Sequence, residues 1–203
     1  LQAQLSWWSR SAIRICGRPG IPSEIASLKW VTMGTTTGYV TADYEKWHPV
    51  VPWIIMGLLF PGGMAGSTAG GMKFVRVMIA VKYLHLTVRR FIHPQGVYAV
   101  RVDDRPVAEE IVMQILAFCF LYVTIFFLFA LGLAATGVDF VTSFGASLAC
   151  ISGTGPGLGL SGAMGNYRSV PMASKWILIA EMMLGRLEFY AVLLVFSRSF
   201  WKK

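Results

Sequence analysis

The sequence VVPWIIMGLLF (50–60) is a short apolar run followed directly by PGGMAGSTAGGMK (61–73), which contains five glycines. A helix over 50–60 rises about 16 Å, roughly half of a bilayer's hydrocarbon core. The glycines let the backbone leave the helix near mid-membrane, where Ser67 and Thr68 offer hydroxyls to the freed backbone groups. The basic run KFVRVMIAVKYLHLTVRR (73–90) then continues toward water. The stretch therefore predicts a transmembrane helix that is broken by an intramembrane loop.

The composition of the chain indicates a membrane protein. Of its 203 residues, 55% are hydrophobic and only 14% are charged, whereas a soluble domain has roughly 25% charged residues. The net charge is +8, but the basic residues gather at the ends of apolar segments, where they report orientation. We therefore expect no nucleic-acid partner. The three cysteines have unrelated spacings and predict neither a disulfide framework nor a zinc site.

Two apolar runs are long enough to cross a bilayer. IVMQILAFCFLYVTIFFLFALGL (111–133) contains no charge and spans a core of roughly 30 Å at about 1.5 Å per residue. WILIAEMMLGRLEFYAVLLVF (176–196) has similar length but contains three charges. Both runs predict transmembrane helices.

Two shorter segments each lead into a glycine-centred turn. Residues 23–34 precede TTTGY (35–39), and residues 140–151 precede GTGPG (153–157). A long membrane segment follows each turn, so the two halves repeat one order. We predict an all-α membrane protein with repeats of transmembrane helix, re-entrant pore helix and loop, and second transmembrane helix, one of these helices being broken. The leading helix of the first repeat is absent, and we expect the chain to be a fragment.

The distribution of basic residues orients these segments. Lysine and arginine are dense between 73 and 110, whereas only Arg168 and Lys175 lie between the two long runs. The positive-inside tendency therefore predicts that the connection 73–110 and the C-terminus are cytoplasmic. Both glycine-centred turns then enter the membrane from the outer side.

Such turns suit a monovalent cation. Backbone carbonyls that converge on one axis replace the hydration shell of the ion, and glycine permits the necessary backbone conformations. The candidate carbonyls belong to Thr36, Thr37, Gly38, Gly153, Thr154 and Gly155. Either turn alone is more simply a surface turn. Two such turns on one predicted face favour a selectivity filter.

Five motifs together resemble the C-terminal half of the TrkH/KtrB/HKT superfamily of potassium transporters, nearest to the bacterial TrkH type. They are TTTGYVTADYEKW, GGMAGSTAGGMKFVR, FIHPQGV, ATGVDFVTSFGASLACISGTGPGLG and KWILIAEMMLGRLEFY. The resemblance runs from about Ser27 to Lys202 and implies one pore built from four linked repeats. It implies a partial third repeat over 23–110 and a fourth repeat over 111–203, after an irregular leader over 1–22.

The resemblance also implies roles for individual residues. Gly38 and Gly155 match the filter glycines, flanked by Thr35, Tyr39, Pro156 and Gly157. Arg186 matches an arginine that projects into the permeation path. The glycine-rich stretch matches an intramembrane gating loop, with the candidate residues Gly62, Gly63, Gly66, Ser67, Thr68, Gly70, Gly71 and Lys73.

The implied function is potassium uptake across the bacterial cytoplasmic (inner) membrane, with potassium as substrate and no other cofactor. The implied partners are the lipid bilayer, the missing first and second repeats, a second copy in a homodimer, and a cytosolic nucleotide-binding ring of the TrkA/KtrA kind. Two departures stand out. Gly153 occupies a position where the family often has asparagine, and Lys29 lies in a segment that is more charged than a normal pore helix.

Alternatives remain for three features. GSTAGGMK (66–73) resembles a phosphate-binding loop, but its lysine comes one residue late and no strand precedes it, which disfavours an enzyme. Arg186 has the simpler interpretation of a snorkelling or salt-bridging residue, with Glu181 and Glu188 nearby but not at i,i+4 spacing. The whole chain can also be a non-conducting membrane scaffold or a truncated remnant of a transporter.

Overall fold

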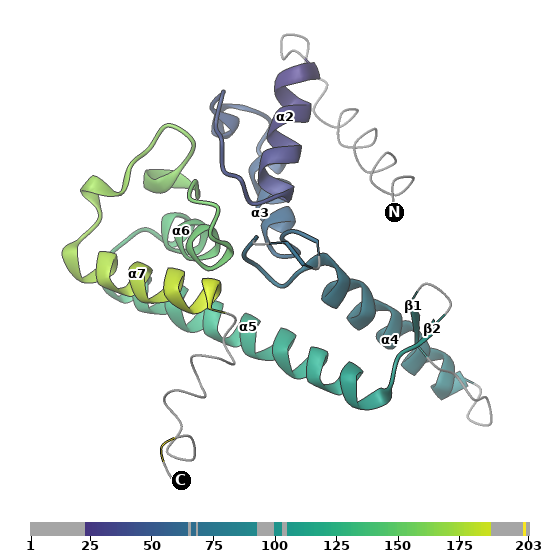
Figure 1. Cartoon of the computed structure of the whole chain (residues 1–203). Helices are drawn as coiled ribbons and strands as arrows, with labels where there is room; N and C mark the ends of the chain where they lie inside the picture. Colours follow the sequence, from purple (N-terminus) through teal and green to yellow (C-terminus); the bar gives the residue numbers. More distant parts are fainter. Residues whose placement is uncertain are drawn as a thin grey trace.

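The computed structural model describes residues 23–64, 66–67, 69–92, 100–102, 105–187 and 201, and this part of the chain is mostly helical (Figure 1). The α-helices are α2 (Ser23–Gly34), α3 (Val50–Leu59), α4 (Phe74–Ile92), α5 (Glu109–Ala135), α6 (Phe140–Ser152) and α7 (Met172–Arg186). The short 3-10 helices are η1 (Tyr44–Lys46), η2 (Gly159–Ser161) and η3 (Tyr167–Ser169), and two strands, β1 (Arg101–Val102) and β2 (Arg105–Pro106), pair antiparallel. The predicted helical fold is confirmed, whereas the leader 1–22 lies outside the described residues.

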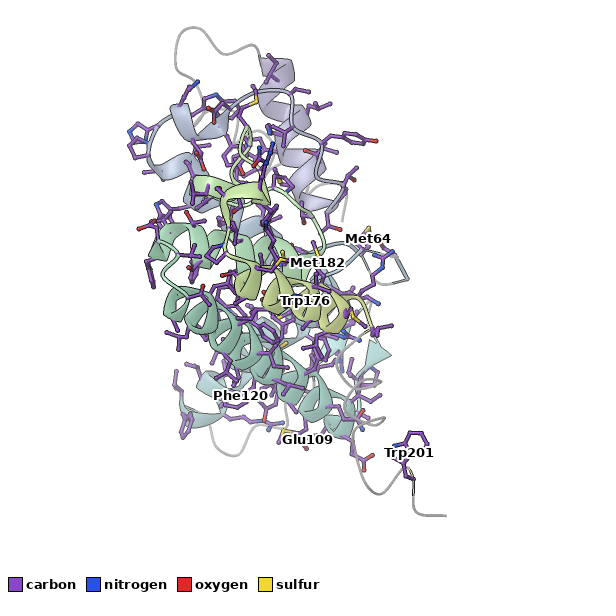
Figure 2. All side chains as sticks on the ribbon, turned by 90° about the vertical axis from the view of Figure 1, so that its left-hand side faces the viewer. Met64, Glu109, Phe120, Trp176, Met182 and Trp201 are labelled. Atoms are coloured by element: carbon purple, nitrogen blue, oxygen red, sulfur yellow. The ribbon has the colours of Figure 1, made fainter. Side chains whose placement is uncertain are left out.

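Helix α5 is the longest of the described helices. It has 27 residues and, among the described helices, is the one long and apolar enough to cross a membrane. Only 17% of its most apolar window is buried, whereas the core helix of a soluble protein would be mostly buried. Phe120 on α5 and Trp176 and Met182 on α7 are also exposed (Figure 2). This apolar surface requires lipid or further protein around it.

The break between α3 and α4 is the predicted one. Helix α3 ends at Leu59, and α4 begins at Phe74, beyond the glycine-rich stretch. Two hydrogen bonds close the base of the intervening loop: the Met72 N–H donates to the Phe60 carbonyl (3.1 Å), and the Phe74 N–H donates to the Gly63 carbonyl (3.1 Å). The start of α4 therefore lies close to the end of α3, and the glycine-rich loop connects the two helices.

Helix α4 runs beside the N-terminal part of α5 (Figure 1). Ile79 of α4 and Val112 of α5 are buried together with Val100, which immediately precedes β1. The two-residue strands were not expected, because the sequence predicted only a polar connection there. The Val107 N–H donates to the Val100 carbonyl (2.8 Å), so burial of Val100 and this closing bond hold the small hairpin on the α4–α5 pair.

Helix α6 is the most enclosed helix and packs against both α5 and α7. Its residues from Thr142 to Ser152 are buried, apart from the half-buried Phe144. A re-entrant helix ends inside the membrane, so its terminal carbonyls must be covered by protein or reach water. The burial of α6 is compatible with the predicted re-entrant helix, which stays a prediction.

Helix α7 starts four residues earlier than the apolar pattern indicated. Its N-cap is Pro171, and it begins at Met172 instead of Trp176. The described helix ends at Arg186, and its C-cap residue is Leu187. The remainder of the predicted span to residue 196 lies outside the described residues, so the second long transmembrane span stays a prediction.

Candidate functional site: two facing turns and a loop beneath them

The turn after α2 folds back onto the last turn of that helix. Thr36 and Gly38 both have left-handed backbones, with φ of 55° and 79°. The Thr36 N–H donates to the Met33 carbonyl (3.1 Å). The N–H groups of Thr37 and Gly38 both donate to the Thr32 carbonyl, at 2.8 and 3.3 Å. These hydrogen bonds give backbone donors to the last carbonyl groups of α2, which have no partner within the helix, and they turn the chain sharply.

The turn after α6 repeats this path residue by residue. Gly153 and Gly155 have φ of 69° and 103°. The Gly153 N–H donates to the Cys150 carbonyl (3.1 Å), and the N–H groups of Thr154 and Gly155 both donate to the Ala149 carbonyl, at 3.0 and 3.4 Å. The donor-to-acceptor spacings equal those of the first turn. Positions 36, 37 and 38 therefore correspond to 153, 154 and 155.

This correspondence accounts for Gly153. Its counterpart in the first turn, Thr36, also has a left-handed backbone. Asparagine tolerates that conformation better than most residues, and glycine adopts it without strain. The glycine at 153 therefore preserves the backbone path that an asparagine would also permit.

The two turns lie against each other. A Cβ on Gly38 would overlap the Thr154 carbonyl oxygen and approach the ring of Pro156. Only a glycine allows the first turn to come this close, and its positive φ gives a second reason for the same residue. The fold thus brings together the two turns that the sequence separates by more than a hundred residues.

Two tyrosines support the second turn from outside, and the sequence reasoning missed both. The Tyr167 hydroxyl of η3 donates to the Gly155 carbonyl (2.7 Å), and the Tyr44 hydroxyl of η1 donates to the Gly157 carbonyl. One lone pair of each carbonyl therefore faces the surrounding protein. Nothing in the local pattern near either tyrosine indicated such a contact, because each partner lies in another loop.

Of the flanking residues, Thr35 and Tyr39 are exposed, whereas Pro156 is half-buried beside Gly38. Thr35 and Thr37 are exposed and their hydroxyls lie 2.8 Å apart, and Tyr39 is 72% exposed. The exposed threonines mark the side of the first turn that no other described segment covers.

The glycine-rich loop lies at the base of the second turn. A Cβ on Gly70 would overlap the Ser152 carbonyl oxygen, one residue before Gly153. Gly66 is exposed near the tip, with φ of 81° and open space around it. The Ser67 hydroxyl accepts a hydrogen bond from the Ala69 N–H (3.0 Å), so Ser67 satisfies a freed backbone group as expected.

Other members of the predicted gating loop shape its backbone. Gly62, Gly71 and Lys73 have left-handed backbones, and Gly62 packs against Gly70 across the loop. Gly63 lies beside Ser67 and Ala69. Thr68 lies outside the described residues.

Arg186 is brought near the same region by α7. Its neighbour Gly185 packs so closely on α6 that a Cβ there would overlap the Ile151 carbonyl oxygen. The Arg186 side chain is exposed. Glu181 is fully buried instead, and its carboxylate oxygen Oε1 lies 2.5 Å from the Ser147 hydroxyl of α6.

The chain resembles known proteins over most of its length. The family model described as "TrkH: Cation transport protein" matches residues 24–203. The Trk system potassium uptake protein TrkH of Halomonas elongata is 39% identical over 173 residues, which is 85% of this chain and 36% of that protein. The protein of the same name from Escherichia coli K12 is 35% identical, over 85% of this chain and 35% of its own length.

A solved structure agrees with the fold. The crystal structure of the potassium transporter TrkH from Vibrio parahaemolyticus superposes with a TM-score of 0.87 at 29% identity, covering 98% of this chain and 44% of that one. The chain therefore spans less than half the length of the relatives it matches, from 35% to 44%. Because the family model covers nearly the whole sequence, this chain belongs to the TrkH family of cation transport proteins.

Proposed function

We propose that this chain supplies two of the four filter segments of a potassium-uptake pore in the bacterial cytoplasmic membrane. The observation that supports this most strongly is the shared backbone path of the turns at Thr36–Gly38 and Gly153–Gly155, which lie against each other. Two equivalent turns at one place are the elements of a repeated ring of ligands. The choice of potassium as the ion rests on the names of the relatives, which are potassium uptake proteins.

The ion ligands are backbone carbonyls of the two turns. Thr36, Thr37 and Gly38 contribute on one side, and Gly153, Thr154 and Gly155 on the other. The Gly155 carbonyl accepts the Tyr167 hydroxyl with one lone pair, which leaves the second lone pair for an ion. Helices α2 and α6 end at these turns, so their partial negative charge adds to the attraction for a cation.

The glycine-rich loop between α3 and α4 and Arg186 control the passage of the ion. The loop packs on the base of the second turn through Gly70, which suits a gate below the filter. Arg186 ends α7 beside Gly185, whose contact with α6 lies two residues before Gly153. A positive charge at membrane depth costs roughly 2.5 to 3.5 kcal/mol unless it faces water or a partner, so a place in the wet permeation path suits Arg186.

The complete pore requires more protein than this chain. Residues 23–110 and 111–203 act as a partial third and a whole fourth repeat, and the first and second repeats supply the other two filter segments. We further propose a homodimer, a cytosolic nucleotide-binding ring of the TrkA/KtrA kind as regulator, and a cytoplasmic location for the 73–110 connection and the C-terminus. The relatives' greater length supports the missing repeats, and the name Trk system supports a multicomponent complex. The dense basic residues over 73–110 support the cytoplasmic location.

Growth of potassium-uptake-deficient bacteria at low external potassium tests the function. The full-length protein is expected to restore growth and potassium uptake, and an otherwise identical plasmid without the gene serves as the control. Membrane insertion without any potassium uptake would contradict the proposal and favour a non-conducting scaffold or remnant.

Replacing Arg186 by alanine is expected to increase potassium uptake several-fold, because a positive charge in the permeation path repels the passing cation. Initial rates of rubidium or potassium uptake by the full-length protein measure the effect. The matched control is Arg168→Ala, which removes the same charge from the exposed loop at η3. Equal uptake rates for the wild type and Arg186→Ala would contradict the proposal that the Arg186 charge is a barrier to the cation.

A further inference from the structure

Lys29 is a buried cation in the second half of α2. Its side chain is 0% exposed, and among the described residues its ammonium has no hydrogen-bond partner. The ammonium lies instead 4.7 Å from the centre of the Tyr44 ring. Burial of a lysine is costly without compensation, and an aromatic face provides part of it. The departure noted in the sequence is therefore a specific contact between α2 and η1.

Tyr44 extends this contact to the other repeat. It is also 0% exposed, and its hydroxyl donates to the Gly157 carbonyl, two residues after the second filter turn. The Tyr44 ring thus faces Lys29, and its hydroxyl binds Gly157 next to the second turn. Any shift of the ring moves a hydrogen bond that anchors the second turn.

The neighbouring residue strengthens the connection. The Glu45 carboxylate accepts a hydrogen bond from the Gly159 N–H (2.6 Å), and a Cβ on Gly162 would overlap that carboxylate. Tyr44 and Glu45 therefore hold residues 157–159 by two hydrogen bonds. The Gly157 carbonyl accepts one from Tyr44, and the Gly159 N–H donates one to Glu45. We call these two side chains the clasp.

We propose that Lys29 is a positioning residue for the second turn, Gly153–Gly155, because it fixes the Tyr44 ring of the clasp and thereby tunes selectivity for potassium over other cations. The proposal rests on the proposed function. It adds that a side chain of one repeat sets the carbonyl geometry of the next. Small displacements of such carbonyls change which ion is coordinated best.

The test compares potassium and sodium uptake by the full-length protein in proteoliposomes. Lys29→Met keeps length but removes the charge, and Tyr44→Phe removes one hydroxyl. Each is expected to lower the potassium-to-sodium uptake ratio about fivefold, the effect of one ordinary hydrogen bond. Lys29→Arg, which keeps a cation over the ring, is expected to retain the ratio. The double variant is expected to lose no more than the larger single variant, because both act through one contact.

The control is Lys46→Met, which removes the same charge from η1, the 3-10 helix that carries Tyr44. The Lys46 side chain is 82% exposed and its ion pair with Asp43 spans 3.4 Å at the surface, so its loss is expected to leave the ratio unchanged. An unchanged ratio in Lys29→Met or in Tyr44→Phe, additive losses in the double variant, or an equal loss in Lys46→Met would each overturn the proposal. If Lys29→Met does not fold, Lys29→Gln takes its place, because it also removes the charge, and an unchanged ratio in it would overturn the proposal in the same way. A wild-type protein that transports no potassium contradicts the proposed function instead.

Discussion

Substitution of Gly38 by alanine is expected to lower potassium uptake about 100-fold. The new Cβ would overlap the Thr154 carbonyl oxygen, and alanine would have to adopt φ of 79°. Overpacking and backbone strain of this kind cost about 3 kcal/mol together, and each 1.4 kcal/mol is a factor of ten. Relief of the strain separates the two turns and removes carbonyls from the ion. Initial uptake rates at equal amounts of membrane-inserted protein measure the loss.

Gly34→Ala is the matched control for this variant. Gly34 ends α2, four residues before Gly38, and an added Cβ there meets nothing within 4 Å. We expect Gly34→Ala to transport like the wild type within about twofold, as surface substitutions outside special sites usually change little. Similar rates for Gly38→Ala and Gly34→Ala would show that the close approach of the turns has no part in transport.

Substitution of Gly70 by alanine is the second large effect. Its Cβ would overlap the Ser152 carbonyl oxygen, so the loop must move away from the base of the second turn. If the docked loop is the closed gate, a clash of about 1.5 kcal/mol in that state raises the open population and the unregulated uptake rate about tenfold. The potassium-to-sodium ratio is expected to stay constant, because the turns themselves are unchanged.

Met64→Ala provides the comparison within the same loop. Met64 is exposed (Figure 2), so its truncation changes the loop without touching α6, and a near wild-type rate is expected. A changed ion ratio in Gly70→Ala at an unchanged rate would contradict the gate and assign the Gly70 contact to the filter.

The apolar pattern predicted those features that depend on local properties. The half-length of α3, the break before Phe74 and the long α5 follow from run length and glycine content, and the structure has all three. The register of the two turns was also predictable, because each is a glycine-centred motif behind a short helix. The beginning of α7 was not, since Ser174 and Lys175 interrupt the apolar pattern within its first turn.

The contacts that hold the turns in place could not be predicted. Tyr44 and Gly157 are separated by 113 residues, and Tyr167 reaches Gly155 from another loop. A tyrosine in a loop has many available partners, and only the packing of both repeats selects one. Lys29 illustrates the same limit: its charge was visible as a departure, whereas its burial depends on a ring supplied by η1.

The central claim is that the two turns bind one row of potassium ions. Its most direct test is a structure of the full-length protein with thallium(I) in place of potassium, because the heavy ion gives a distinct signal at a potassium site. We predict ion density between the turn at Thr36–Gly38 and the turn at Gly153–Gly155, reduced by competing potassium and not by sodium. Ion density elsewhere in the pore, with none beside these two turns, would contradict the account.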